Sequence, residues 1–251
     1  MAVVLYCFAT GEKSMSAAGQ KEITSAYYNR AYYAKHLERL NRKDRFTRVK
    51  INRVASLLRP KTGERIIDLG CGVGTMTILL APLGATMIGM DYSLDSLAIA
   101  REWFRKEEPA RTFRGLCCDG RAIAMANDSV EGVIAVDFTE HLDDALLVPT
   151  VREVYRVLKK GGKFVVYTPC KTHLFEQLKK HNIILKEDVS HIGLRTMKEY
   201  LVILKAAGFS VRESYFEPTH IPLFNILEKA IMPFPALGDF AKRRICIRAE
   251  K

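Results

Sequence analysis

Long apolar runs, paired cysteine motifs and internal repeats are all missing from this sequence. No apolar run reaches the roughly 20 residues that a helix needs to cross a bilayer, so we expect no transmembrane span. The six cysteines include no Cys-x-x-Cys pair, which argues against a disulfide framework and against a zinc site of that spacing. No basic residue precedes the apolar residues 2–9, so a secretory signal is not expected. These absences predict a cytoplasmic protein.

Acidic residues are also scarce relative to basic ones, with 28 Asp and Glu against 39 Lys and Arg and a formal net charge of +11. The basic excess gathers in residues 30–61, where the only acids are Glu38 and Asp44. Three interpretations are open: a solvated helix face, attraction to an anionic membrane surface, or attraction to nucleic acid. Nucleic acid is disfavoured as a partner because no recognised nucleic-acid-binding module accompanies the charge.

Glycine, in contrast, is concentrated where it can serve a ligand. A strand-length apolar run at residues 66–69 ends at three glycines on alternate positions, Gly70, Gly72 and Gly74. A strand, a glycine turn and a helix leave backbone N–H groups where a ligand can approach closely. A second apolar run at residues 85–91 ends at Asp91, whose carboxylate can accept hydrogen bonds from a ribose diol. The stretch therefore predicts a nucleoside-binding half-site.

Residues 68–74, Asp-Leu-Gly-Cys-Gly-Val-Gly, resemble the first motif of the class I S-adenosylmethionine-dependent methyltransferases. The dinucleotide-binding fingerprint is similar, but it has a third glycine where this chain has Thr75. The resemblance implies an enzyme with S-adenosyl-L-methionine as its methyl donor. The donor-binding residues that it implies are Asp68, Gly70, Cys71, Gly72, Gly74, Asp91, Tyr92, Asp119 and Asp137. A nicotinamide-dependent oxidoreductase and a non-catalytic nucleotide-binding protein on a Rossmann-like scaffold are the alternatives.

Strand-like and helix-like segments alternate along the rest of the chain. We expect strands at residues 66–69, 85–91, 111–117, 130–138, 163–168, 210–216 and 244–249, and helices at 94–106, 149–160 and 196–208. The resemblance implies an α/β fold with a Rossmann-like, doubly wound, seven-stranded sheet that is mostly parallel with an antiparallel last strand. Residues 1–58 are expected to form an N-terminal extension and helical cover, in which Tyr27, Tyr28, Tyr32 and Tyr33 line one side of a pocket. Residues 59–251 are expected to form the methyltransferase domain, with an insertion at 217–242.

Two regions could supply further polar groups to the site. Asp119 matches an acidic residue that binds the adenine amino group in the resembled family, although an Asx-turn before Gly120 explains it equally well. His141, after the fourth strand, and His191, before the capped helix, are the candidate general bases for an acceptor that carries a proton. A structural role for either histidine, donating to a backbone carbonyl, is the alternative.

Asp137-x-x-Glu140-His141 is similar to the Glu-x-x-Glu-His run of the ubiquinone-type O-methyltransferases, in which those side chains hold a divalent ion. Oxygen ligands with one imidazole would suit Mg²⁺ or Zn²⁺. A metal-free wall of the donor pocket is the favoured interpretation here, so no metal ligand is assigned.

The predicted reaction is methyl transfer to an oxygen or nitrogen of a small or lipid-like acceptor. Residues 221–237 contain an apolar helical stripe with a thin polar face, which together with the basic segment favours peripheral contact with an anionic membrane. The alternative is that this helix packs on its own domain or on a second copy in a homo-oligomer.

Overall fold

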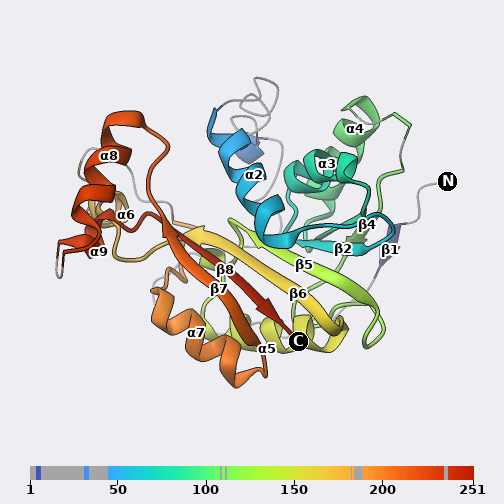
Figure 1. The fold of residues 1–251 in the computed structure, drawn as a ribbon. Helices are drawn as coiled ribbons and strands as arrows, with labels where there is room; N and C mark the ends of the chain where they lie inside the picture. Colours follow the sequence, from blue (N-terminus) through green and yellow to red (C-terminus); the bar gives the residue numbers. More distant parts are fainter. Residues whose placement is uncertain are drawn as a thin grey trace.

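One eight-stranded sheet organises the computed structural model, which describes residues 4–6, 31–33, 45–107, 109–110, 112–181, 183, 189–234 and 237–251. Its strands are β1 (Val4–Tyr6), β2 (Arg65–Leu69), β3 (Thr86–Asp91), β4 (Gly115–Cys117), β5 (Val130–Val136), β6 (Leu158–Pro169), β7 (Ser210–Glu217) and β8 (Arg244–Glu250). Their spatial order is β1-β4-β3-β2-β5-β6-β8-β7 (Figure 1). Only β8 runs antiparallel to its neighbours β6 and β7. The predicted seven-stranded sheet is confirmed, and β1 adds a parallel edge strand beside β4.

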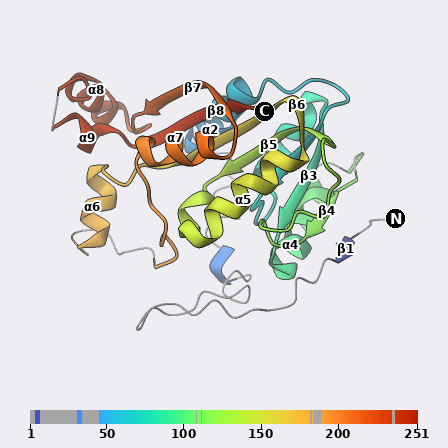
Figure 2. The same cartoon turned by 90° about the horizontal axis from the view of Figure 1, so that it is seen from below.

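Helices cover both faces of the sheet, as the doubly wound prediction requires. They are α2 (Arg45–Leu58), α3 (Thr75–Leu80), α4 (Leu94–Glu107), α5 (Asp144–Val157), α6 (Leu174–Lys180), α7 (Met197–Ala206), α8 (Pro222–Ile231) and α9 (Gly238–Ala241), with single 3-10 turns η2 (Ala81–Leu83) and η3 (Thr139–His141). Helices α2, α3 and α4 lie on one face, and α5 and α7 on the other (Figures 1 and 2). Helices α6, α8 and α9 gather beyond the end of the sheet (Figure 1). Among the described residues, no helix combines the length and apolarity that crossing a membrane requires.

The two faces follow from the two-residue period of the strands. In β2, Ile66 joins the core cluster under α2, α3 and α4, and the adjacent Ile67 joins the cluster under α5 and α7. Both side chains are fully buried, which is why the central parallel strands read as continuous apolar runs. The core therefore fixes the central strands from both sides, and their carboxyl ends converge on one edge.

The structure moves both boundaries of one predicted helix, because residues 158–160 at its predicted end belong to β6. The helix expected at residues 149–160 is α5, which begins after the N-cap Asp143 and ends at Val157. The carboxylate of Asp143 accepts a hydrogen bond from the backbone N–H of Leu146, so capping starts the helix before Pro149 rather than at it. The predicted capping box at the start of α7, between Thr196 and Glu199, is confirmed.

The basic segment is less solvent-directed than its composition suggests. Within α2, Lys50 and Arg53 form ion pairs with Asp137 and Glu217, at 2.8 and 2.9 Å. These pairs tie α2 to the end of β5 and to β7 across the sheet. Residues 30 and 34–44 of the basic segment, and the predicted pocket residues Tyr27 and Tyr28, lie outside the described residues.

Candidate functional site

The glycine turn after β2 is shaped by backbone conformations that other residues rarely adopt. Gly70, Gly72 and Gly74 have φ angles of +69°, +52° and +79°. A Cβ at Gly70 would lie 2.1 Å from the Phe138 ring, and a Cβ at Gly72 would lie 3.0 Å from the hydroxyl oxygen of Tyr33. The backbone N–H groups of Gly70 and Cys71 donate to the carbonyl oxygen of Met90, at 2.8 and 2.9 Å. The turn is therefore fastened to β3 and leaves room only for backbone.

Asp68 and Asp91 hold the two ends of this turn. Asp68 is 2% exposed, and its Oδ2 accepts from the backbone N–H of Thr77 at 2.9 Å and from its hydroxyl at 2.7 Å. Burial raises the pKa of Asp68 to about 6, against the opposing effect of the Thr77 bonds. The observed contacts of Asp68 thus stabilise the start of α3, and its predicted contact with the donor stays a prediction.

Asp91 lies at the carboxyl end of β3 and faces the glycine turn. Its Oδ2 accepts from the backbone N–H of Gly72, and its Oδ1 from that of Ser93, both at 2.9 Å. Burial raises the pKa of Asp91, while the backbone N–H bonds favour the charged form. Tyr92 follows with 45% of its surface exposed. The predicted ribose-binding carboxylate is therefore placed beside the turn, with one aromatic ring open to solvent next to it.

Asp119 forms the local turn that the alternative interpretation predicted. Its Oδ1 accepts from the backbone N–H of Arg121 at 2.8 Å, which is an Asx-turn, and its Oδ2 pairs with the Arg121 guanidinium at 2.7 Å. Burial would raise the pKa of Asp119, but the bonds from Arg121 outweigh it and lower that pKa. The Asx-turn is confirmed, and the predicted adenine contact remains a prediction.

Asp137, at the end of β5, is bound by two cations that sequence reasoning did not connect to it. Its Oδ2 accepts from Lys50 of α2 at 2.8 Å, and its Oδ1 accepts from Arg244 of β8. Burial would raise the pKa of Asp137, but the charges of Arg244 and Lys50 hold that pKa well below its usual range. Asp137 has a φ of +50°, a conformation that Asp tolerates better than most residues. The carboxylate predicted to face the donor is thus committed to joining three elements.

The two candidate bases, 50 positions apart in the numbering, are brought together beside Glu140. The ring centroids of His141 and His191 are 5.1 Å apart, and one ligand atom from each histidine and from Glu140 lies within 4.8 Å of the others. His141 Nδ1 is 3.0 Å from the carbonyl oxygen of Ser190, and buried Glu140 accepts from the hydroxyl of Thr168 at 2.9 Å. The Ser190 contact is of the kind that the structural alternative predicted for His141. Because Asp137 is bound to Lys50 and Arg244, the three described residues close enough to share a metal ion are Glu140, His141 and His191, rather than the hypothesised set with Asp137.

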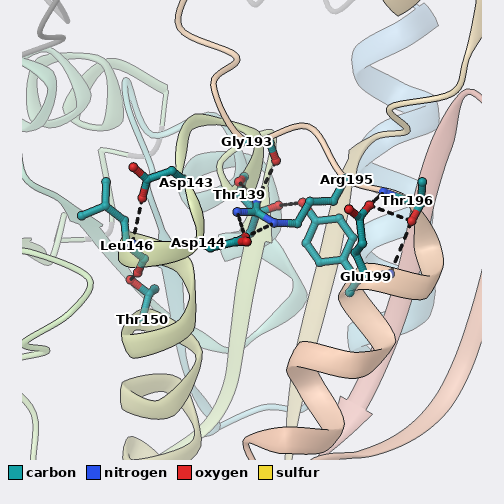
Figure 3. Close-up of polar contacts among 10 residues, drawn as sticks. Thr139, Asp143, Asp144, Leu146, Thr150, Gly193, Arg195, Thr196 and Glu199 are labelled. Atoms are coloured by element: carbon teal, nitrogen blue, oxygen red, sulfur yellow. Dashed lines mark hydrogen bonds and ion pairs between the residues drawn. The ribbon is translucent and has the colours of Figure 1, made fainter. Parts of the chain in front are cut away.

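A buried arginine positions the loop that carries His191. The Arg195 guanidinium contacts the carboxylate of Asp144 at 2.6 Å, the carbonyl oxygen of Gly193 at 2.6 Å and that of Thr139 at 3.3 Å (Figure 3). A Cβ at Gly193 would lie 1.8 Å from the carbonyl oxygen of Leu142, so this loop lies backbone against backbone on the segment after β5. Sequence reasoning missed Arg195, because its partners are distant in sequence and only Gly193 marks the close approach.

Glu176 of α6 extends the site towards a cavity of about 380 Å³ at the end of β6. Its Oε2 lies 3.8 Å from His191 Nδ1, and its Oε1 lies 2.8 Å from Lys179 Nζ. Burial would raise the pKa of Glu176, but the bonds from His191 and Lys179 hold it at about 2. A permanent negative charge therefore lies between the histidine pair and the cavity.

Comparisons with known proteins agree with this geometry. Residues 66–162 match the family described as "Methyltransferase domain". The chain is 32% identical to 24-methylenesterol C-methyltransferase 2 of Oryza sativa, over 66% of this chain and 46% of that protein. It is 27% identical to the mitochondrial ubiquinone biosynthesis O-methyltransferase of Mus musculus, over 70% of this chain and 46% of that protein. The chain thus matches less than half the length of these curated relatives.

The fold has a close counterpart among solved structures. An S-adenosylmethionine-dependent methyltransferase from Thermotoga maritima superposes with a TM-score of 0.66 at 18% identity, over 91% of this chain and 100% of that one. At 18% identity this similarity shows only that the two proteins share a fold.

Proposed function

The chain belongs to the class I S-adenosylmethionine-dependent methyltransferases, and from that membership we propose that it transfers a methyl group to a small or lipid-like acceptor. The observation that carries the proposal is the carboxyl edge of the parallel strands, where the glycine turn follows β2, Asp91 ends β3 and the 3-10 turn that contains His141 follows β5. A donor cradle and candidate bases at the same edge are what methyl transfer to a protonated acceptor requires.

The residues of the turn fit the donor. Only glycine fits at positions 70 and 72, where a Cβ would meet the Phe138 ring or the Tyr33 hydroxyl. Because the N–H groups of Gly70 and Gly72 already donate to Met90 and Asp91, the turn would offer the donor close approach to its backbone rather than free N–H groups. Asp91 would accept hydrogen bonds from the ribose hydroxyls of the donor, and the exposed ring of Tyr92 would lie against its adenine ring. When bound, S-adenosylmethionine supplies an electrophilic methyl group on a sulfonium leaving group.

The protein's own contribution is to orient the acceptor, exclude water and accept a proton. His191 would take the proton from the acceptor oxygen or nitrogen at one of its ring nitrogens, and the Glu176 carboxylate, 3.8 Å from Nδ1, would stabilise the imidazolium that results. His141, whose Nδ1 contacts Ser190, would orient the His191 ring through their edge-to-face packing at 5.1 Å. A base of this kind contributes about 10²–10⁴-fold to the rate.

The experiment is direct. Purified protein is incubated with S-adenosylmethionine labelled on the methyl group and with fractionated metabolite and lipid extracts, and labelled products are identified by mass spectrometry. We expect transfer that falls at least about 100-fold in His191→Gln with donor affinity unchanged. Binding of a nicotinamide dinucleotide in place of the donor, detected by thermal stabilisation of roughly 2.7 kcal/mol at 100 times the dissociation constant, would support the oxidoreductase alternative instead.

An apolar surface on the 217–242 insertion supports a lipid-like acceptor delivered at a membrane. Leu223 and Ile226 on α8 are 81% and 67% exposed, and Phe234 and Leu237 extend the apolar surface. The curated relatives include a sterol methyltransferase and a ubiquinone biosynthesis methyltransferase, whose names point to apolar acceptors. An exposed apolar stripe near basic residues is typical of helices that lie in the membrane interface.

Liposome flotation tests this surface. We expect recovery with anionic vesicles that disappears in Leu223→Ser/Ile226→Ser while donor affinity is unchanged. No recovery, together with full activity on a wholly water-soluble acceptor, would refute the membrane proposal. Loss of a dimer in the same double variant, measured by sedimentation, would show that the surface packs on a second copy instead.

A carbon acceptor is the second candidate, because one relative is a sterol C-methyltransferase at 32% identity. Product analysis separates the two. A methyl group on oxygen or nitrogen leaves the acceptor's carbon skeleton unchanged, whereas a new carbon–carbon bond resists chemical demethylation.

A further inference from the structure

The cavity beside the histidine pair is lined by more positive than negative charge. Arg243 and Arg244, at the start of β8, and Lys179 of α6 contribute three cations, and Glu176 contributes the single carboxylate. Glu176 is already shared between Lys179 and His191. The lining therefore carries an excess of positive charge that its own carboxylate does not neutralise.

Among the described residues that line the cavity, Arg243 is the cation without an ion pair. Among the described residues, no carboxylate lies within ion-pair distance of Arg243, whereas Arg244 pairs with Asp137 and Lys179 with Glu176. The Arg243 Nη1 donates to the hydroxyl of Thr219, a neutral group. Its guanidinium also lies over the Phe175 ring, 5.7 Å from the ring centre. Partial burial and the like charge of Arg244 lower the pKa of Arg243, and the more distant charges of Glu228 and Glu176 oppose this effect without outweighing it.

The carboxylate on the adjacent helix α8, that of Glu228, bonds to other groups and forms no ion pair with Arg243. Glu228 accepts from Thr219 N–H through Oε2, and its Oε1 lies 3.0 Å from His173 Nε2. The contact through Oε1 holds α8 to the N-cap of α6, and the bond through Oε2 holds the segment before α8. The charge of Glu228 therefore acts on Arg243 only from beyond ion-pair distance. A partly desolvated guanidinium next to another cation is unfavourable until an anion reaches it.

Apolar side chains complete the cavity and continue out of it. Phe175, Leu178 and Ile221 line it together with the cations. The Phe175 ring lies 6.1 Å from that of Phe224 on α8, so the apolar lining continues onto the exposed surface of that helix. The cavity thus offers a cationic end and an apolar path to the outside.

From this arrangement we propose that the acceptor is an anionic amphiphile, whose carboxylate or phosphate is bound by Arg243 and whose apolar part lies along Phe175, Leu178 and Ile221. The inference rests on the proposed function, because it assigns this cavity to the methyl acceptor. The cavity adjoins the base, since Glu176 lines it and contacts His191. Arg243 is thereby a specificity-determining residue that favours anionic over neutral acceptors.

Calorimetry with simple probes tests the site without any methyl transfer. Octyl phosphate, octanoate, octanol and inorganic phosphate are titrated into the whole chain and into Arg243→Gln. The matched control is Lys180→Gln, which removes one positive charge from the exposed end of α6 outside the lining. We expect both octyl anions to bind at least about 10-fold more tightly than octanol, and Arg243→Gln to weaken them by about 10- to 100-fold. Lys180→Gln should change them by less than about 3-fold.

Equal binding of octanol and the octyl anions, or an unchanged affinity in Arg243→Gln, would overturn the inference. Unchanged donor affinity shows that Arg243→Gln is folded, and Arg243→Lys, which keeps the charge, should recover part of the anion binding. A second comparison distinguishes a free metabolite from a lipid headgroup. The octyl anions represent a soluble ligand, and phosphatidylcholine vesicles that contain phosphatidylglycerol present an anionic lipid headgroup. A response to Arg243→Gln with the vesicles alone would overturn binding of a soluble anion.

The outcomes for the two proposals are separable. If no acceptor is methylated but the octyl anions bind through Arg243, the proposed function fails and the anion site stands. If a neutral acceptor is methylated equally well by the native protein and by Arg243→Gln, the function stands and the anionic acceptor is refuted.

Discussion

Replacing Gly70 by alanine should damage the site through a collision that can be measured separately from backbone strain. The new Cβ would lie 2.1 Å from Cδ2 of Phe138, a contact that cannot form without movement of the turn or the ring. A non-glycine residue at φ +69° costs about 1–2 kcal/mol, and loss of unfolded-state entropy returns about 0.4–1 kcal/mol. Overpacking adds about 1–3 kcal/mol. The expected loss of unfolding free energy is therefore about 1–5 kcal/mol.

Gly63→Ala is the matched control. Gly63 also has a positive φ, +86°, but a Cβ there meets nothing within 4 Å. Its substitution therefore measures strain alone, and we expect Gly70→Ala to be more destabilising by about 1–3 kcal/mol in urea unfolding. Gly70→Ala should also weaken donor binding at least about 10-fold in calorimetry, because the Gly70 N–H fastens the turn to Met90 beside Asp91. Gly63→Ala should leave donor affinity unchanged.

A double variant tests the cause. Adding Phe138→Ala removes the ring that the new methyl group meets, so the destabilisation by Gly70→Ala should shrink towards that of Gly63→Ala. Equal destabilisation by the two single substitutions, or strict additivity with Phe138→Ala, would show that the turn accommodates a side chain and would refute the reasoning.

Three further predictions concern carboxylates and a buried histidine. Asp91→Ala should weaken donor binding at least about 10-fold in calorimetry and also lower the unfolding free energy by about 1–3 kcal/mol, because two backbone N–H groups lose their acceptor; unchanged donor affinity would remove Asp91 from the site. Asp137→Asn should lower the unfolding free energy, measured in urea, by about 2 kcal/mol or more, because it leaves two partly buried cations without a counter-charge. Asp239→Asn removes an exposed ion pair and should lower it by less than about 1 kcal/mol. Equal losses in the two variants would contradict this prediction. Burial lowers the pKa of His173 from its usual 6.5, so the unfolded chain binds more protons and stability should fall as pH drops below about 6.5. His173→Gln should remove that part of the pH dependence, and superimposable pH–stability curves would show that His173 does not titrate there.

The parts of the site that the sequence could predict are those whose residues lie close together in the chain. The strand ends directly before Gly70, and Asp91 lies 21 positions after Gly70. Each of these features depends on local backbone chemistry. The Asx-turn at Asp119 was also readable, because its partner is two residues away. Local signals were also sufficient to locate the strands, and the resemblance supplied the mostly parallel, seven-stranded sheet with its antiparallel last strand.

The parts that sequence could not predict depend on distant partners. Asp137 pairs with residues 87 and 107 positions away, and nothing in its own motif indicates that two cations bind it. The adjacency of His141 and His191 likewise follows from the packing of the loop that Arg195 holds. The start of α5 was misplaced because Pro149 is a stronger pattern than the single capping carboxylate of Asp143. Long-range electrostatics and packing account for Asp137 and for the histidine pair, whereas the start of α5 depends on a local cap.

The position of β8 between β6 and β7 has a consequence for how the protein is synthesised. Strand β7 leaves the ribosome before β8, yet β8 is its partner in the sheet, so β7 must wait unpaired. During the same interval β6 presents an open, apolar edge, because its antiparallel neighbour is also β8. An unpaired strand edge is prone to pair with other chains. Until β8 is inserted, the nascent chain therefore has two strand edges, on β6 and on β7, at which pairing with other chains can compete with folding.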